Sequence, residues 1–388
     1  MTRCIYLDHN ATTPIDPRAL DAMLPYLREA CGNASSKTHA FGWQANEAVE
    51  KARAQVARLL GASSREVVFT SGATESNNVA LIGYMTAGDP SLLKNKHVIT
   101  QQTEHPAVLD PLRVLERQGC EVTYLQPDEH GQVSVNQVRD ALRANTALVS
   151  IMAAKNEIGV LQPIEAIAAV CGEAGVLFHT DAAQAVGKIP IDMKGTGIDL
   201  LSLSGHKFYA PKGVGALVVR SRTPRIRLSP ILFGGGQEKG LSPGTLNVPG
   251  VVGLGAACEI AQEELPEESA RLIALRERLY GALGSGLDGV HQNGHPTDRL
   301  PGTSSFSFEG VDGAALLISL NALAVSSGSA CSSGTSDPSH VLKAIGVSEQ
   351  LARSTVRFGL GRFTTEEEVE EAARQVIGAV KQLRGRRL

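Results

Sequence analysis

The 388-residue chain is poor in aromatic side chains and has almost no net charge. Phe, Trp and Tyr make up 4% of it, whereas 40 residues are glycine, a composition typical of an α/β enzyme with many tight turns. The formal net charge is −3, so bulk electrostatics predict binding neither to nucleic acids nor to membranes. No apolar run approaches the roughly 18 residues of a membrane span, and the N-terminus lacks the apolar core of a signal peptide.

The cysteines are scattered, and no two of them form a Cys-x-x-Cys pair. The six positions are Cys4, Cys31, Cys120, Cys171, Cys258 and Cys331. This spacing argues against a zinc site and a disulfide framework, so we expect no metal and a location in the reducing cytoplasm. The phosphate-loop pattern Gly-x4-Gly-Lys-Ser/Thr is also absent, which argues against a nucleoside triphosphate as ligand.

Short apolar runs alternate with helical patterns from about residue 45 to residue 260, which predicts an α/β fold. The runs are continuous rather than alternating, so we expect a mostly parallel sheet with helices on both faces. Strands are expected at residues 67–70, 97–100, 121–125, 147–152 and 176–180, followed by a strand pair at 200–203 and 215–219.

A polar, acidic stretch at residues 262–268 predicts a domain boundary. A chain of this length is typical of roughly two domains. We expect a large domain at residues 15–262 and a smaller α+β domain composed of residues 1–14 and 263–388. Near the end, Thr365 and Glu368 form a capping box before apolar residues at helical spacing, which predicts a last helix.

Two polar residues that follow apolar runs indicate the chemistry. Lys207 ends a Ser-Gly-His-Lys turn, and Asp181 directly follows the run at 176–180. A lysine amine binds the aldehyde of pyridoxal phosphate, and a carboxylate holds its protonated pyridine nitrogen. Gln184 is placed to donate to the phenolic oxygen of such a cofactor. A surface lysine and a helix-capping aspartate are the alternative interpretations.

Other residues suit phosphate binding and proton transfer. Residues 71–77 lie between a strand and a helix, where free backbone N–H groups bind phosphate, and Thr74 adds a hydroxyl. Ser204 and His206 flank the lysine turn and suit the same phosphate. His105 follows the strand at 97–100 and suits stacking and proton transfer, because imidazole titrates near neutrality. Simple N-capping and a structural histidine are the alternatives.

A thiol and a guanidinium complete the set. Cys331 lies in a stretch rich in glycine and serine, residues 326–334, with no apolar neighbour to bury its sulfur. This suits a nucleophile that must move. Arg357 is a lone cation in a strand-like segment, as expected of a bidentate carboxylate anchor. An incidental cysteine and a structural ion pair are the alternatives.

In their order and joint presence, these motifs resemble those of the cysteine desulfurases. These are pyridoxal-phosphate enzymes of fold type I in the class V aminotransferase group. The resemblance covers nearly the whole chain, and its most specific parts are residues 204–207 and 326–331. It also includes residues 6–14, 69–76, 103–105, 156–159 and Asp181 with Gln184. The long serine-rich cysteine loop is similar to the subgroup that serves iron–sulfur cluster and thiolation pathways.

The resemblance implies a seven-stranded sheet in the large domain and a role for each candidate residue. The implied catalytic residues are Lys207, which holds the cofactor, His105, which stacks on it, and Cys331, which accepts sulfur. The other implied cofactor ligands are Ala73, Thr74, Asp181, Gln184, Ser204, His206 and, from a neighbouring subunit, Thr245. Asn156 and Arg357 are implied to bind the substrate carboxylate. A ligand supplied by a neighbouring subunit implies a homodimer.

Two positions differ from the family pattern. Members usually have Arg-x-Gly-Thr where this chain has Ser242, Pro243, Gly244 and Thr245. They also usually have Asn-Asn-Glu, and this chain has Lys155 in place of the first asparagine. An added cation at that position is expected to alter substrate affinity or the pKa values of the site.

The implied reaction is the desulfuration of L-cysteine to L-alanine. Lys207 removes the α-proton, and the Cys331 thiolate attacks the substrate sulfur to form a persulfide. The sulfur then passes to an acceptor protein, either a scaffold or a thiolation enzyme. Selenocysteine lysis, another class V reaction and a non-catalytic scaffold role are the alternatives.

Overall fold

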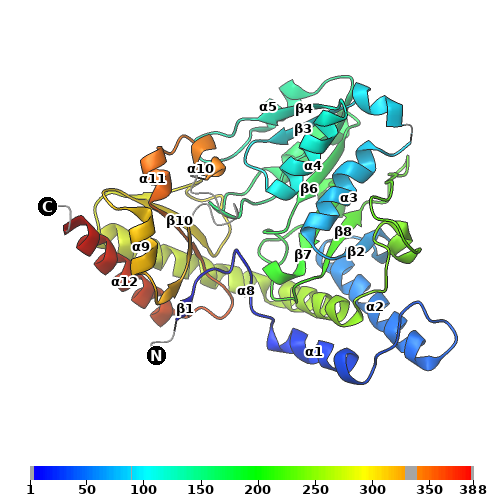
Figure 1. Cartoon of the computed structure of the whole chain (residues 1–388), viewed down its shortest axis with the longest axis horizontal. Coiled ribbons are helices and arrows are strands. Elements are labelled where there is room, and N and C mark those ends of the chain that lie inside the picture. Colours follow the sequence, from blue (N-terminus) through cyan, green and yellow to red (C-terminus); the bar gives the residue numbers. More distant parts are fainter. Residues whose placement is uncertain (1–3, 89, 328–338, 386–388) are drawn as a thin grey trace.

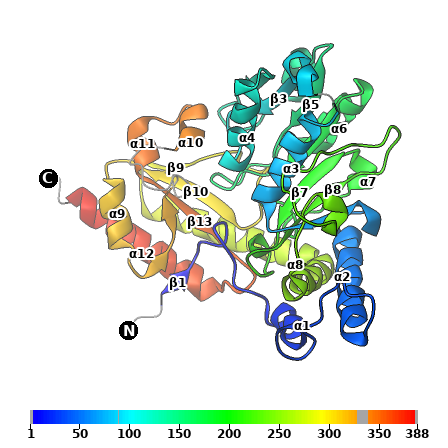
Figure 2. The same cartoon turned by 45° about the vertical axis from the view of Figure 1, so that its right-hand side comes forward.

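The computed structural model of the chain describes residues 4–88, 90–327 and 339–385. Figure 1 and Figure 2 show a larger body built on one sheet and a smaller body, with the long helix α8 (Val248–Gly286) running from one to the other. None of the helices in these residue ranges is long and apolar enough to cross a lipid bilayer.

The large sheet has seven strands in the order β2-β8-β7-β6-β5-β3-β4. Only β8 runs antiparallel to its neighbours, so the sheet is mostly parallel, and β7 and β8 form the pair expected around the lysine turn. The strands are β2 (Val67–Thr70), β3 (His97–Gln101), β4 (Glu121–Leu125), β5 (Thr146–Ser150), β6 (Leu177–Asp181), β7 (Leu200–Ser204) and β8 (Gly215–Val219). The predicted fold class and the predicted strands are confirmed.

Both faces of this sheet are buried, which explains why its strands read as continuous apolar runs. On β7, Leu200 contacts the apolar cluster under α3 and α4, whereas Leu201 contacts the cluster under α2, α6 and α8. Leu177 and Phe178 divide in the same way on β6. The covering helices are α1 (Pro17–Arg28), α2 (Ala40–Leu59), α3 (Ala73–Met85), α4 (Pro106–Arg117), α5 (Val135–Ala141), α6 (Ile164–Glu173) and α7 (Met193–Thr196).

Among the described residues, short 3-10 helices connect these elements: η1 (Ser64–Glu66), η2 (Pro90–Asn95), η3 (Gly205–Lys207) and η4 (Gln237–Gly240). Of these, η3 concerns the site most directly. It is the turn that follows β7, and its last residue is Lys207.

The smaller body contains an antiparallel sheet in the order β12-β13-β10-β9 and a separate parallel pair of β1 with β11. The strands are β1 (Ile5–Tyr6), β9 (Val290–Gln292), β10 (Thr303–Phe308), β11 (Leu323–Ala324), β12 (Ser326–Ser327) and β13 (Thr355–Gly359). The helices are α9 (Gly313–Ser319), α10 (His340–Ala344), α11 (Glu349–Arg353) and α12 (Glu366–Gly385). The capping box before α12 is present, since Thr365 and Glu368 each accept a hydrogen bond from the backbone N–H of the other.

The predicted boundary at residue 262 falls inside α8, which continues through it without a break. Up to Cys258, buried residues of α8 pack into the core of the larger body, and from Leu272 onward they pack into the core of the smaller one. Leu7 also belongs to the smaller core. The division into residues 15–262 on one side and 1–14 with 263–388 on the other stays a prediction.

Candidate active site

A cavity of about 560 Å³ lies where β2, β3, β5, β6 and β7 of the large sheet end. The carboxyl ends of parallel strands meet at one edge of a sheet, which is where α/β proteins place their ligands. Nine of the residues predicted from the sequence line this cavity: Ala73, Thr74, His105, Asn156, Asp181, Gln184, Ser204, His206 and Lys207. Residues separated by more than 130 positions in the chain are thus brought to one place.

Asp181 is the last residue of β6 and is 4% exposed. One carboxylate oxygen accepts a hydrogen bond from Asn77 Nδ2 at 2.7 Å, and the other accepts one from the Ala183 N–H at 2.9 Å. Asn77 is fully buried on α3, and the sequence analysis did not single it out. Its neighbours Ser76 and Asn78 are also polar, so the local sequence carries no signal that separates Asn77 from them.

Lys207 contacts a segment near the start of the chain. Its Nζ donates to the backbone carbonyls of Asn10 and Ala11, both at 2.8 Å. The neighbouring His206 carbonyl accepts hydrogen bonds from the Thr13 N–H and Oγ1. Residues 8–13 therefore fix the position of the lysine turn.

His206 is a neutral side chain in this environment. Burial, followed by the charge of Lys207, lowers its pKa to about 4. Its Nδ1 lies 3.2 Å from Thr12 Oγ1. At neutral pH it therefore contributes hydrogen bonding rather than charge.

The start of α3 is available for an anion. Gly72 caps the helix with a φ of 153° and provides no side-chain hydrogen bond to the first turn. The backbone needs room here, because a Cβ on Gly215 of β8 would lie 2.7 Å from the Gly72 Cα. Uncapped N–H groups at a helix start bind phosphate, and Thr74 and Ser204 add hydroxyls at the same cavity.

His105 is the N-cap of α4, and its Nδ1 accepts a hydrogen bond from the Ala107 N–H at 3.1 Å. Burial lowers its pKa, Asp181 opposes that shift, and Lys155 adds to it. The neutral ring therefore carries its proton on Nε2, since Nδ1 is the acceptor.

Arg357 forms an ion pair in the structure, as the alternative interpretation proposed. It is 2% exposed on β13, and its Nη2 lies 2.7 Å from Asp8 Oδ1. Its Nη1 donates to the Asn156 carbonyl at 3.2 Å, and its Nε has no partner among the described residues. Arg357 is thus next to the cavity residue Asn156, and its role as a carboxylate anchor stays a prediction.

Arg357 does not line the cavity, and neither of the two remaining predicted residues is among the described residues that line it. Thr245 is exposed between η4 and α8, and its role in a neighbouring subunit's site stays a prediction. Cys331 lies outside the described residues.

Lys155 is 1% exposed, and its Nζ lies 3.6 Å from Glu157 Oε1. The charge at this position is therefore internal and paired. Ser242 and Pro243, the other departure, are partly exposed.

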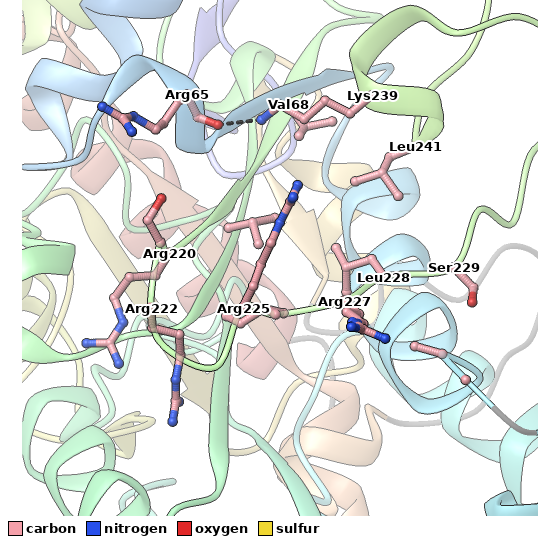
Figure 3. A pocket seen from close by; sticks show the side chains of 15 residues that line it. Arg65, Val68, Arg220, Arg222, Arg225, Arg227, Leu228, Ser229, Lys239 and Leu241 are labelled. Atoms are coloured by element: carbon pink, nitrogen blue, oxygen red, sulfur yellow. Dashed lines mark hydrogen bonds between the residues drawn. The ribbon is translucent and has the colours of Figure 1, made fainter.

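A second cavity, of about 870 Å³, lies away from the first (Figure 3). Its cationic residues are Arg65, Arg220, Arg222, Arg225, Arg227 and Lys239. No carboxylate is among the described residues that line it, although Arg220 and Arg222 both contact the nearby Asp199. The near-zero net charge hides this cluster, because it averages over the whole chain.

The first cavity fits pyridoxal 5'-phosphate. It offers an amine at Lys207, a buried and hydrogen-bonded carboxylate at Asp181, and the uncapped start of α3. These groups match the aldehyde, the pyridine nitrogen and the phosphate of that cofactor.

Comparison with known proteins agrees with this geometry. Residues 5–371 match the family "Aminotransferase class-V". The chain is 55% identical to "Cysteine desulfurase IscS" from Anaeromyxobacter sp. (strain Fw109-5), over 98% of this chain and 93% of the relative.

Two solved structures have the same fold. One is a "NIFS-LIKE PROTEIN", with a TM-score of 0.89 at 38% identity, covering 98% of this chain and all of that one. The other is "SspA in complex with cysteine", with a TM-score of 0.82 at 40% identity, covering 93% of this chain and 100% of that one. The chain therefore belongs to the class V aminotransferase family and, within it, to the cysteine desulfurases, whose cofactor is pyridoxal 5'-phosphate.

Proposed function

We propose that this cysteine desulfurase converts L-cysteine to L-alanine and transfers the sulfur to Cys331 as a persulfide. The substrate C–S bond breaks, an S–S bond forms on Cys331, and protons from the two thiols balance alanine and the persulfide. The observation that carries the proposal is the single cavity that holds Lys207, Asp181 and His105 together. A related structure, titled as SspA in complex with cysteine, supports cysteine as the substrate.

Four groups would hold the cofactor. Lys207 would bind its aldehyde carbon, Asp181 would face its ring nitrogen, and the start of α3 with Ser204 would hold its phosphate. When bound, pyridoxal phosphate supplies an electron-withdrawing ring that stabilises negative charge at the substrate α-carbon. Asn77 keeps the Asp181 carboxylate in one orientation, so the charge that faces the ring nitrogen is fixed.

Lys207 and His105 move the protons. The Lys207 amine would take the α-proton of the substrate. The carbonyls of Asn10 and Ala11 orient this amine through their hydrogen bonds. His105 exchanges protons through Nε2, because Nδ1 is occupied by the Ala107 N–H.

Two contacts support the role of Cys331, although it lies outside the described residues. Ser326, five positions before it, pairs with Arg357 in the small sheet. Ser339, eight positions after it, donates a hydrogen bond to Glu157, the neighbour of Asn156. One contact is with Arg357 itself and the other is with the residue next to Asn156, and these are the two residues proposed to bind the substrate carboxylate.

The chain is proposed to act as a homodimer in the cytoplasm and to pass its sulfur to an acceptor protein. The exposed apolar side chains of Phe41, Trp43, Leu232 and Phe233 are the surface groups that we propose to lie in the subunit interface. In such a dimer, Thr245 of one subunit would complete the phosphate site of the other.

Turnover of L-cysteine by the purified protein tests this function. We expect equal amounts of alanine and transferred sulfur, with a mass increase of one sulfur on the Cys331 peptide. Cys331→Ser should keep the colour of the bound cofactor and release no sulfide. Cys258→Ser is the matched control, because this thiol is fully buried and away from the cavity. Unimpaired sulfide release by Cys331→Ser would refute the mechanism.

A further inference from the structure

Lys188 is a partly buried amine behind the active site to which the proposed chemistry gives no task. It follows Gln184 by four residues in a series of turns after β6. Its Nζ donates to Gln184 Oε1 at 2.8 Å. Gln184 Nε2 in turn donates to the Asn10 carbonyl at 2.8 Å, and Lys207 donates to the same carbonyl.

These contacts permit only one orientation of the Gln184 amide. The Lys188 amine donates to the amide oxygen and, when protonated, cannot accept a hydrogen bond, whereas the Asn10 carbonyl can only accept one. The amide oxygen must therefore face Lys188, and the NH₂ group must face Asn10. One hydrogen of that NH₂ group bonds the Asn10 carbonyl, and the second remains for a ligand in the cavity that Gln184 lines.

Lys188 also acts on Lys207 through charge. Burial, then the charges of Lys207 and Arg357, lowers the Lys188 pKa to about 7, while Glu268 opposes the shift. Interactions between charges are reciprocal, so a protonated Lys188 disfavours a proton on Lys207. His9 and His206 are the other titratable groups that sense Lys188, and their pKa values are both lowered.

We propose that Lys188 is a positioning residue that holds the Gln184 amide with its NH₂ group toward the cofactor and disfavours protonation of the nitrogen that joins Lys207 to the cofactor. The inference rests on the proposed function, since it takes Gln184 and Lys207 as cofactor ligands. In this inference Lys188 acts without being a ligand of the cofactor or the substrate. Through Gln184 and the Asn10 carbonyl, Lys188 also connects residues 8–13 to the pH response of the site.

Lys188→Met tests the inference, because it keeps the length of the side chain and removes both the donor and the charge. The cofactor-free protein is titrated with pyridoxal 5'-phosphate, and the visible absorption band of the bound cofactor is followed against pH. We expect about tenfold weaker binding from the lost orientation of one hydrogen bond. The midpoint of the spectral change should rise by about one pH unit, since removing a neighbouring cation favours the protonated form.

Three further variants separate positioning from a general structural role. Lys188→Arg keeps the donor and the charge, and it should restore both measurements. Lys194→Met removes an exposed cation at the start of α7 and should change neither. In a Gln184→Ala background, Lys188→Met should weaken binding by only about twofold or less, because the two residues act as a unit.

An unchanged midpoint and affinity in Lys188→Met would overturn the inference, as would an arginine variant that behaves like the methionine variant. If Lys188→Met does not fold, Lys188→Gln retains a donor without the charge, and the upward shift of its midpoint decides the charge effect. A different result would refute the proposed function itself: the wild-type protein, titrated with pyridoxal 5'-phosphate, would show no visible absorption band that depends on Lys207.

Discussion

Replacing Lys155 by methionine should destabilise the protein, because it removes one partner of an internal ion pair. The Lys155 and Glu157 side chains are 2% and 7% exposed, and their charged atoms lie 3.6 Å apart. Breaking a buried ion pair by removing one partner costs about 3–5 kcal/mol, because the other charge is left buried and uncompensated. The low end, about 3 kcal/mol, applies here, since Ser339 still donates to Glu157.

Thermal unfolding measures this effect. At about 2.1 cal/mol/K per residue, a chain of this length has an unfolding entropy near 0.8 kcal/mol/K, so the midpoint should fall by about 4 °C. Lys155→Met combined with Glu157→Gln removes both charges and should recover most of the loss. If Lys155→Met unfolds at the wild-type temperature, or if the second substitution recovers nothing, the pair is not the source of the stability.

Two further predictions concern buried polar groups of the site. Asn77→Ala should weaken cofactor binding by about tenfold or more, because it removes a hydrogen bond to the buried Asp181 carboxylate. Asn78→Ala is the control and should bind the cofactor normally, because the Asn78 amide donates to the helix backbone at Thr74. Equal affinities in the two variants, by cofactor titration, would contradict the role of Asn77. Burial raises the pKa of Glu104 to about 8, so the folded state holds a proton that the unfolded state has lost above its ordinary pKa of 4.5. The contribution of Glu104 to the free energy of unfolding is therefore largest below about pH 4.5 and is lost as the pH rises through about 8. In Glu104→Gln, the thermal unfolding midpoint should depend less on pH over that range. If the unfolding midpoint depends on pH in the same way in the wild type and in Glu104→Gln, the prediction that Glu104 is protonated in the folded state is wrong.

The sequence predicted the parts of the site that depend on local order. The run before Asp181 and the strand pair around Lys207 are apolar because both faces of the sheet are covered, and that pattern is readable from neighbouring residues. The partners of these residues were not readable. The backbone carbonyls of Asn10 and Ala11 bind Lys207, and a carbonyl has no sequence signature.

Composition was a weaker guide at residues 262–268. The acidic stretch predicts a domain boundary, whereas in the structure it is part of helix α8 and two of its carboxylates are paired. Glu264 contacts Arg18 at the edge of the larger body, and Glu268 contacts Arg362 in the smaller one. Such pairs are tertiary contacts, so the charges that suggest solvent exposure in the sequence stabilise the helix in the fold.

The position of residues 8–13 has a consequence for how the enzyme is made. His9 bonds to Gly359 on β13, a residue 350 positions away, and the same short segment holds the lysine turn through Thr13 and Asn10. Contacts of such long sequence separation form late, because the intervening chain must first be ordered. During synthesis, the larger sheet is complete well before β13 emerges. The cofactor lysine should therefore acquire its final partners only in the last stage of folding, and newly made chains should bind the cofactor later than they acquire secondary structure.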